Sequence, residues 1–317
     1  MSALTETELL AQGPHTRAMP LMDYHLSPGV SKSTLDWVSK STALVQWNRN
    51  APEDTEADSA VDLGTAFHAL LLEPDLFGDQ YVRDFEPPLD AIATVDQLKA
   101  ALDARGLSYK ASATKRDLTA ALLSVDPQAP VVDSLRGEWE RGTRGRIVLT
   151  RAEWRKINLM WGSAMAHPTV KLIFAAEGHN ERCHYWTDEL TGLLCRSRPD
   201  REIPKLGMLL DVKTAARIDR FESSILEYRY HVQDRFYSEG YHATQGEPPK
   251  TFAFLVVSST LDRRKYPVRL KQITTTHREI AAAAIRQDLA TYAAAKKADD
   301  WNDVETAELP PWFRMPE

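Results

Sequence analysis

The sequence predicts a mixed α/β fold in which helices come first and a sheet with helices packed on it follows. Two observations give this prediction. In the first half of the chain, apolar residues recur at helical spacing, and from about residue 180 they alternate in the way that is typical of strands. The 317 residues are enough for one large or two modest domains with a buried core.

The N-terminal part is predicted to be an irregular lead-in followed by two helices. Residues 1–28 contain several prolines and glycines that interrupt any regular pattern. Ser31 offers an N-cap for a helix that runs to about Leu44. A second, strongly apolar helix is expected over residues 60–73, and Pro74 stops it.

Residues 94–125 are predicted to be a small inserted module of two helices joined by an extended turn, with prolines on both sides. The segment resembles SAP-like or helix–extension–helix motifs, which occur in several DNA-associated proteins. Its basic residues make DNA contact one interpretation, and a protein-docking or spacer role is the other. These residues are Lys99, Arg105, Lys110, Lys115 and Arg116.

The rest of the chain is predicted to build the sheet and its covering helices. Together these elements predict one domain over residues 29–300, with an extension over residues 301–317. Helices are expected at 131–141, 150–166, 217–229, 232–243 and 275–297, and strands at 179–187, 193–203, 207–214, 251–258 and 266–273.

Composition limits the classes of function. The chain has 39 Lys and Arg against 45 Asp and Glu, a net charge of −6, which argues against a protein covered all over with basic residues but not against a local basic groove. No apolar run approaches the ~18 residues of a membrane span. Cys183 and Cys195 are too few for a disulfide framework. We therefore expect a cytoplasmic protein without a membrane partner.

The sharpest motif is a pair of aspartates on successive predicted strands. Asp200 follows Pro199, and Asp211 begins the triplet Asp-Val-Lys that ends with Lys213. Adjacent strands would place the two carboxylates side by side, where a divalent cation is their natural partner. Lys213 would share a strand face with Asp211, so the set suits metal-assisted hydrolysis of a phosphodiester. The alternative is a surface Asp–Lys pair.

Two further motifs have helical spacing. Gly64 and His68 lie one turn apart on a predicted helix, so the imidazole is a candidate third metal ligand. Gln233 and Tyr237 share one face of a later helix, where they could hold a phosphate or an attacking water. Taken singly, each motif also fits an ordinary half-buried histidine or the border of an amphipathic helix.

The motifs GTAFH, RPD, DVK and QDRFY, in this order and at these distances, resemble the PD-(D/E)xK nucleases of the RecB-like branch. The similarity is greatest to RecE-like nucleases, the C-terminal domain of exonuclease VIII, and covers roughly residues 25–275. The resemblance implies a restriction-endonuclease-like core, a mixed central sheet flanked by helices. It also implies that His68, Asp200, Asp211 and the Val212 carbonyl bind metal and that Lys213 is catalytic.

In the same family pattern, Gln233 and Tyr237 would be the accessory motif, and Glu73 is a further candidate close after His68. The implied activity is a Mg²⁺-dependent 5′–3′ exodeoxyribonuclease that acts on linear double-stranded DNA and leaves 3′ overhangs. Mn²⁺ is a plausible substitute, because imidazole suits borderline metals. The resemblance also implies a ring-shaped homotetramer and a RecT-like annealing partner. The sequence has no phosphate-binding G-x-x-x-x-G-K-[ST] motif, so no ATP requirement is expected.

Basic side chains near the acidic pair are candidate DNA ligands. Strand alternation could aim Arg196 and Arg198 toward the same groove as Asp200, where they would contact DNA phosphates.

Three other functions stay open at this stage. They are another nuclease of the same fold, endonucleolytic or of different polarity, a catalytically inactive DNA-binding assembly protein, and a zinc module built on Cys183, His184 and Cys195. The intact acidic pair and lysine disfavour the second, and the missing C-x-x-C spacing disfavours the third.

Overall fold

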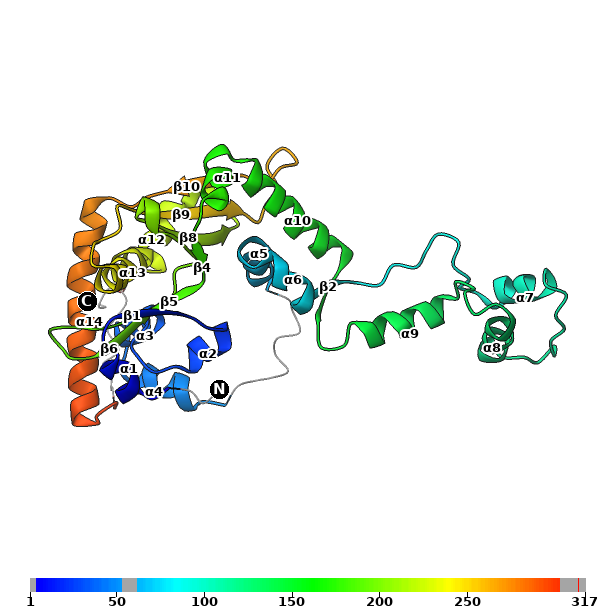
Figure 1. Cartoon of the computed structure of the whole chain (residues 1–317), viewed down its shortest axis with the longest axis horizontal. Helices are drawn as coiled ribbons and strands as arrows, with labels where there is room; N and C mark the ends of the chain where they lie inside the picture. Colours follow the sequence, from blue (N-terminus) through cyan, green and yellow to red (C-terminus); the bar gives the residue numbers. More distant parts are fainter. Residues whose placement is uncertain (1–3, 53–61, 303–312, 314–317) are drawn as a thin grey trace. The chain divides into compact units, whose positions relative to one another are not determined.

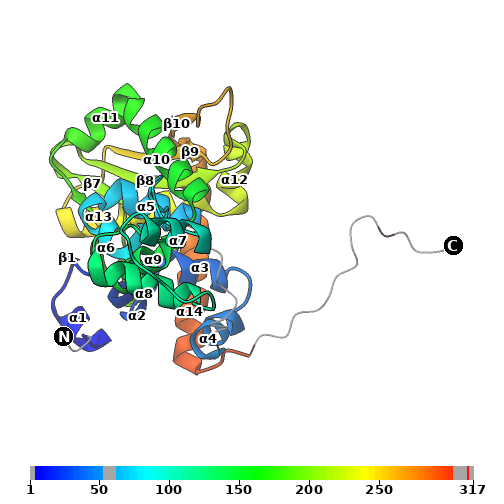
Figure 2. The same ribbon diagram turned by 90° about the vertical axis from the view of Figure 1, so that its right-hand side faces the viewer.

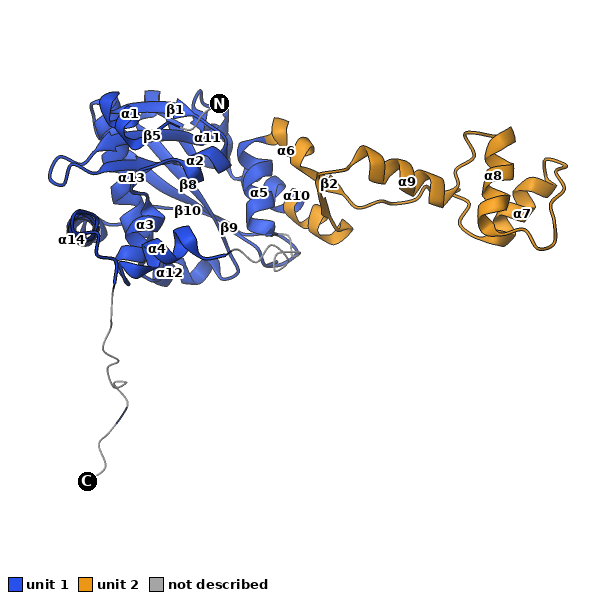
Figure 3. Ribbon diagram, turned by 90° about the horizontal axis from the view of Figure 1, so that it is seen from below, with its two compact units in different colours: residues 1–73, 158–317 blue, residues 74–157 orange. Residues whose placement is uncertain are grey.

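The structure is a computed structural model in which residues 4–52, 62–302 and 313 are described (Figure 1). The chain divides into two compact units, which we call unit 1 (residues 1–73 and 158–317) and unit 2 (residues 74–157) (Figure 3). The predicted extension over 301–317 falls almost wholly outside the described residues, as do residues 60 and 61 of the second predicted helix.

Unit 1 contains the five-stranded and the three-stranded sheet and most of the described helices. Its helices are α1 (Glu6–Ala11), α2 (Leu21–Leu26), α3 (Lys32–Val38), α4 (Ala43–Asn50), α5 (Leu63–Leu72), α11 (Pro168–Ala175), α12 (Phe221–Glu227), α13 (Tyr230–Gln245) and α14 (Thr275–Ala298). Its strands are β1 (His15–Ala18), β4 (His179–Asn180), β5 (Arg182–Thr187), β6 (Leu194–Ser197), β7 (Arg201–Ile203), β8 (Met208–Ala215), β9 (Thr251–Ser258) and β10 (Val268–Lys271).

The central sheet has five strands in the order β10-β9-β8-β7-β4. Figure 2 labels four of them, β7, β8, β9 and β10. Strands β8 and β9 are parallel and the other pairs antiparallel, so the sheet is mixed. A second, antiparallel sheet has the order β1-β5-β6. The predicted mixed α/β fold with helices around a central sheet is confirmed.

Two of the predicted strands are broken in the structure. Glu181, whose φ is +55°, separates β4 from β5, and the segment Arg198 to Asp200 separates β6 from β7. Pro199 in that segment has no N–H to offer a ladder. At both breaks the chain leaves one sheet and enters the other. Strands β4 and β7 belong to the five-stranded sheet, and β5 and β6 belong to the three-stranded sheet.

Helix α13 packs against strands of both sheets. Its residues Val232 and Phe236 pack into a core with β5, β6, α3 and α14, whereas Tyr241 packs with the aromatic residues of β9. The approach to β5 is close, because a Cβ added at Gly240 would lie 2.5 Å from a ring carbon of Trp186. This helix is therefore held firmly against the strands that carry the predicted site.

The prediction that residues 1–28 are irregular is wrong for the described part of that segment. Thr5 and Glu8 form a capping box at the start of α1, and β1 pairs with β5. Leu9 and Tyr24 are buried against the three-stranded sheet. These elements are short, so tertiary packing rather than local propensity stabilises them.

Unit 2 comprises α6 (Pro74–Gln80), β2 (Tyr81–Arg83), α7 (Val95–Asp103), α8 (Lys115–Val125), α9 (Val132–Gly142), β3 (Ile147–Leu149) and the start of α10 (Arg151–Ala166). Strands β2 and β3 pair in parallel. The described residues include no helix that is long and apolar enough to cross a membrane.

The predicted two-helix module appears as α7 and α8, each begun by a capping box. Leu98, Leu102, Leu118 and Leu122 form its core. Two of its five predicted basic residues are ion-paired, Arg105 with Asp126 and Lys115 with Asp133. The proposed DNA contact of this module stays a prediction.

Candidate active site

The two predicted carboxylates lie side by side. Strands β7 and β8 are antiparallel with Arg201 opposite Leu210, which places Asp200 beside the Asp211 segment. The backbone N–H of Val212 donates a hydrogen bond of 2.5 Å to Asp200 Oδ2. Burial, followed by the negative charge of Asp211, raises the pKa of Asp200 to about 6.

Lys213 lies against the second carboxylate, as the spacing of two residues on one strand predicts. Its Nζ is 2.6 Å from Asp211 Oδ2 and 4.8 Å from the centroid of the Tyr230 ring. Burial acts to lower the pKa of Lys213, but the charges of Asp211 and Asp200 outweigh it and raise the pKa. Lys213 is therefore an ammonium group, able to stabilise negative charge rather than to accept a proton.

Helix α13 supplies a second contact to Asp211. Gln233 donates a hydrogen bond of 2.5 Å from Nε2 to Asp211 Oδ1. Tyr237, one turn further along, interacts with Gln233, and burial raises the pKa of its hydroxyl well above the ordinary value. The structure thus brings both predicted accessory residues to the acidic pair, with the tyrosine protonated.

His68 reaches the site from α5. Gly64 allows this helix to approach β8 closely, because a Cβ at that position would lie 3.1 Å from Thr214 Oγ1. His68 Nδ1 is 3.7 Å from Asp200 Oδ2, which is too long for a hydrogen bond but close enough for an electrostatic interaction. The predicted third ligand is therefore adjacent to the carboxylates.

Glu181 is a site residue that the sequence did not reveal. Its backbone N–H donates to the Asp200 carbonyl at 3.0 Å. Burial and, next, the charge of Asp200 raise the pKa of Glu181 to about 8; Glu73 and Asp211 contribute to this rise, and Arg198 opposes it. No motif contains Glu181; only the strand break beside it brings this carboxyl to the acidic pair.

Glu73, the predicted accessory acid, is the C-cap residue of α5 and is half-buried. It lies close enough to Glu181 to raise the pKa of that group. The structure thus places Glu73 at the edge of the acidic cluster, and its part in catalysis stays a prediction.

Arg196 and Arg198 occupy a different position from the one predicted. The two residues are only 8% and 7% exposed. Arg196 donates to the carbonyls of Tyr24 and Gly29, and its Cζ lies 4.5 Å from the centroid of the Tyr24 ring. Arg198 donates to the Glu181 carbonyl at 3.0 Å. These buried guanidinium groups bind the N-terminal segment and Glu181 instead of facing a DNA groove.

The donor set suits a hard divalent cation. Asp211 Oδ2 is buried and accepts no well-directed hydrogen bond within the described residues, although Lys213 lies beside it. Carboxylate oxygens are the ligands that Mg²⁺ prefers. The described residues contain no group of three or more His, Cys, Asp or Glu side chains already arranged around one ion. Lys213 and Gln233 each contact one oxygen of Asp211, and a carboxylate oxygen keeps a second lone pair for a cation.

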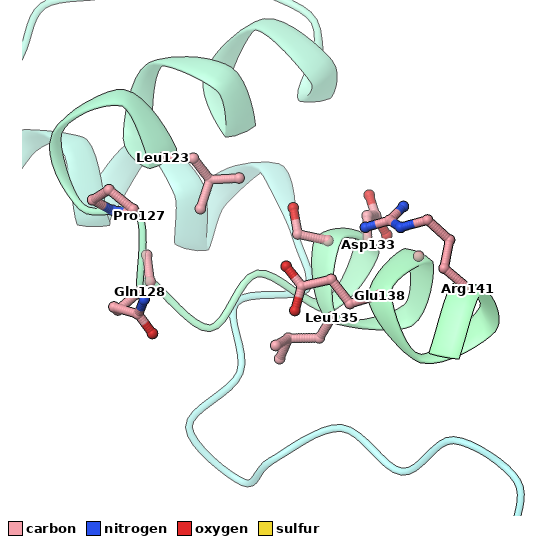
Figure 4. Close-up of a pocket in the computed structure, with 10 residues that line it drawn as sticks. Leu123, Pro127, Gln128, Asp133, Leu135, Glu138 and Arg141 are labelled. Atoms are coloured by element: carbon pink, nitrogen blue, oxygen red, sulfur yellow. The ribbon is translucent and has the colours of Figure 1, made fainter. Parts of the chain in front are cut away.

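Two other places are poor candidates. A cavity of about 330 Å³ in unit 2 is lined by residues of the α8–α9 region and contains none of the predicted site residues (Figure 4). In the zinc alternative, both ring nitrogens of His184 are already bonded, Nε2 to Glu202 and Nδ1 to Thr244. The acidic pair with Lys213 is therefore the candidate active site.

Comparison with known proteins adds a family match. Residues 31–309 match the family described as "PDDEXK-like domain of unknown function (DUF3799)". A crystal structure from Eubacterium rectale, described as a "Putative exonuclease", is 12% identical with a TM-score of 0.39, and the alignment covers 66% of this chain and 82% of that chain. A search of curated proteins gives no match.

Proposed function

Since the chain belongs to the family of PDDEXK-like domains of unknown function, we propose that it is a metal-dependent nuclease. One observation carries the proposal. Asp200, directly before β7, lies beside Asp211 in the adjacent strand β8, and Asp211 is held by both Lys213 and Gln233. Paired carboxylates with a neighbouring ammonium suit hydrolysis of a phosphodiester, because the reaction develops negative charge at phosphorus-bound oxygens.

Each residue has a distinct part in this proposal. His68, Asp200, Asp211 and the Val212 carbonyl hold a Mg²⁺ ion, and Mn²⁺ can replace it because imidazole suits borderline metals. Once bound, the ion polarises the phosphate and lowers the pKa of a water. Lys213 stabilises the charge that develops on the phosphate, and Gln233 fixes the carboxylate of Asp211. Tyr237, as a protonated phenol, supports Gln233.

The finer proposal follows the RecE-like motifs. The protein digests one strand of linear double-stranded DNA from the 5′ end, without ATP, and leaves a 3′ overhang. It acts in the cytoplasm as a ring-shaped homotetramer and delivers the overhang to a RecT-like annealing protein. The resemblance of GTAFH, RPD, DVK and QDRFY in this order supports each of these points.

Digestion of end-labelled DNA tests the proposal. Linear 5′-phosphorylated duplex, labelled at either the 5′ or the 3′ end, and closed circular duplex would each be incubated with and without Mg²⁺. We expect Mg²⁺-dependent release of the 5′ label first, with circles intact. The variant Asp211→Asn should be inactive. Lys205→Ala, which alters an exposed lysine paired with Glu177, is the matched control and should be fully active.

Other outcomes separate the alternatives. Early release of the 3′ label would reverse the polarity, and cleavage of closed circles would indicate an endonuclease of the same fold. Binding of DNA without any cleavage would indicate a DNA-binding assembly protein and would contradict the proposed catalysis.

A further inference from the structure

The connection between β9 and β10 has three consecutive basic residues at its tip, Arg263, Arg264 and Lys265. Two backbone hydrogen bonds close the turn, from Asp262 N to Lys265 O at 2.8 Å and from Lys265 N to Asp262 O at 2.9 Å. The central residues Arg263 and Arg264 have φ values of +46° and +67°. A two-residue loop with positive φ at both central positions is a type I′ turn.

Arginine is an unusual choice for both central positions. Type I′ turns favour Asn-Gly, because a Cβ atom makes the left-handed conformation costly for most residues. Backbone strain of this kind is found preferentially at functional sites. Arg263 and Arg264 therefore place two long cationic side chains at the central positions of the turn, where Asn and Gly are the favoured residues.

The charges at this tip are not neutralised by ion pairs. All three basic residues are exposed, and none of them takes part in an ion pair or side-chain hydrogen bond with the residues that the structure describes. Lys271, further along the same hairpin, is in contrast paired with Glu222. With Asp262 as the acidic residue of the turn, the four residues 262–265 carry a formal charge of 3 − 1 = +2.

The tip lies at the same end of the sheet as the C-terminal end of β8, the strand that carries Asp211 and Lys213. Strands β8 and β9 are parallel, with Lys213 opposite Val256, and Ser259 N donates to Ala215 O just beyond the paired residues. In Figure 1 the loop after β9 projects from this end of the sheet. Arg263 follows Val256 by seven residues, which span at most about 23 Å. This is the length of about seven base pairs of duplex.

Resting on the proposed nuclease function, we propose that the tip formed by Arg263, Arg264 and Lys265 grips the phosphate backbone of the DNA substrate within about seven base pairs of the scissile bond. The tight two-residue turn fixes the backbone that carries Arg263 and Arg264. Contacts to phosphates carry no sequence preference, which suits an enzyme that digests any sequence.

The variant Arg263→Asn/Arg264→Gly tests this grip without disturbing the fold, because it installs the preferred turn residues while removing two charges. Binding to a linear duplex of about 30 base pairs would be measured by fluorescence anisotropy in EDTA at about 50 to 200 mM salt. We expect the slope of log affinity against log salt to fall in magnitude by about two. Between those salt concentrations this amounts to about a tenfold smaller loss of affinity than in the wild type.

Two controls make the result specific. Lys296→Ala/Lys297→Ala removes the same charge near the end of α14 and should leave the slope unchanged. Metal-dependent hydrolysis of the small diester bis(p-nitrophenyl) phosphate, which is too short to reach the tip, should be equal in the wild type and the hairpin variant. The melting temperature of the hairpin variant should be equal to or above that of the wild type.

Each other result has a defined meaning. An unchanged salt slope in the hairpin variant, or an equal fall of the slope in the α14 control, would overturn the inference. If the wild type were nevertheless an active nuclease, the proposed function would still hold. A wild-type protein that neither binds DNA nor cleaves the diester would overturn both.

Discussion

Replacing Asp200 with Asn should stabilise the metal-free protein while it abolishes nuclease activity. The Asp200 side chain is 13% exposed, and burial together with Asp211 raises its pKa from 3.8 to about 6. A shift of about two units means that ionised Asp200 lowers the free energy of unfolding by about 3 kcal/mol. Asn keeps an oxygen that can accept the hydrogen bond from Val212 N, so this variant removes charge rather than packing.

The effect has a defined pH window. Below about pH 3 the carboxyl is largely protonated in both the folded and the unfolded chain, so it does not change stability. As the pH rises from about 3 to 7, the unfolded chain releases its proton first and the folded protein loses stability. Above about pH 7 the loss is complete. Glu181, whose pKa Asp200 helps to raise to about 8, acts in the same direction.

Urea unfolding in EDTA would measure the effect. We expect the gain in unfolding free energy of Asp200→Asn over the wild type to be about 3 kcal/mol larger at pH 8 than at pH 3. Glu189→Gln, which alters an exposed carboxylate in the turn after β5, should show no such difference. A gain that is the same at both pH values, or a variant less stable than the wild type at pH 8, would refute the reasoning.

Three further predictions follow from the same contacts. Gln233→Leu should lower the steady-state rate on linear duplex about ten- to a hundredfold, because a hydrogen bond to an ionised group such as Asp211 contributes roughly 1.5–3 kcal/mol. Gly240→Ala should lower the free energy of unfolding in urea by about 1–3 kcal/mol, since its Cβ would lie 2.5 Å from the Trp186 ring. Replacing residues 93–130 with a short glycine linker should leave hydrolysis of a small diester unchanged, because a backbone bridge already joins the ends of this segment and the site residues belong to unit 1.

Each of these three predictions has an outcome that would contradict it. Full activity of the Gln233 variant would show that its hydrogen bond does not support catalysis. A Gly240 variant as stable as the wild type would mean that α13 can move away from β5 at no cost. Loss of diester hydrolysis on removal of residues 93–130 would show that the module contributes to the chemistry itself.

The proximity of most of the candidate site residues could be predicted from the sequence because their geometry is local. Asp211 and Lys213 share a face of one strand, Gln233 and Tyr237 share a face of one helix, and a short turn brings Asp200 to the neighbouring strand. Once the strands and helices are correctly predicted, the sequence spacing of these residues therefore determines which side chains lie close together. The long helices could be predicted for the same reason, since α13 and α14 have clear apolar periods.

The remaining features depend on tertiary contacts that spacing does not encode. Glu181 joins the site only because the chain breaks there to pass between two sheets. Alternation correctly indicates that Arg196 and Arg198 lie on the same side, but not that the segment around Tyr24 covers that side. The same burial of Tyr24 turns an apparently irregular N-terminus into ordered structure.

The central claim is that Lys213 and the two aspartates form a metal-dependent hydrolytic site. The most direct measurement is the release of acid-soluble nucleotide from linear duplex DNA by the wild type and by Lys213→Met, with Mg²⁺ and with EDTA. We expect release by the wild type in Mg²⁺ alone and a rate for Lys213→Met at least about a hundredfold lower, as for removal of one group that stabilises transition-state charge. Release in EDTA, or an undiminished rate in the Lys213 variant, would contradict the assignment.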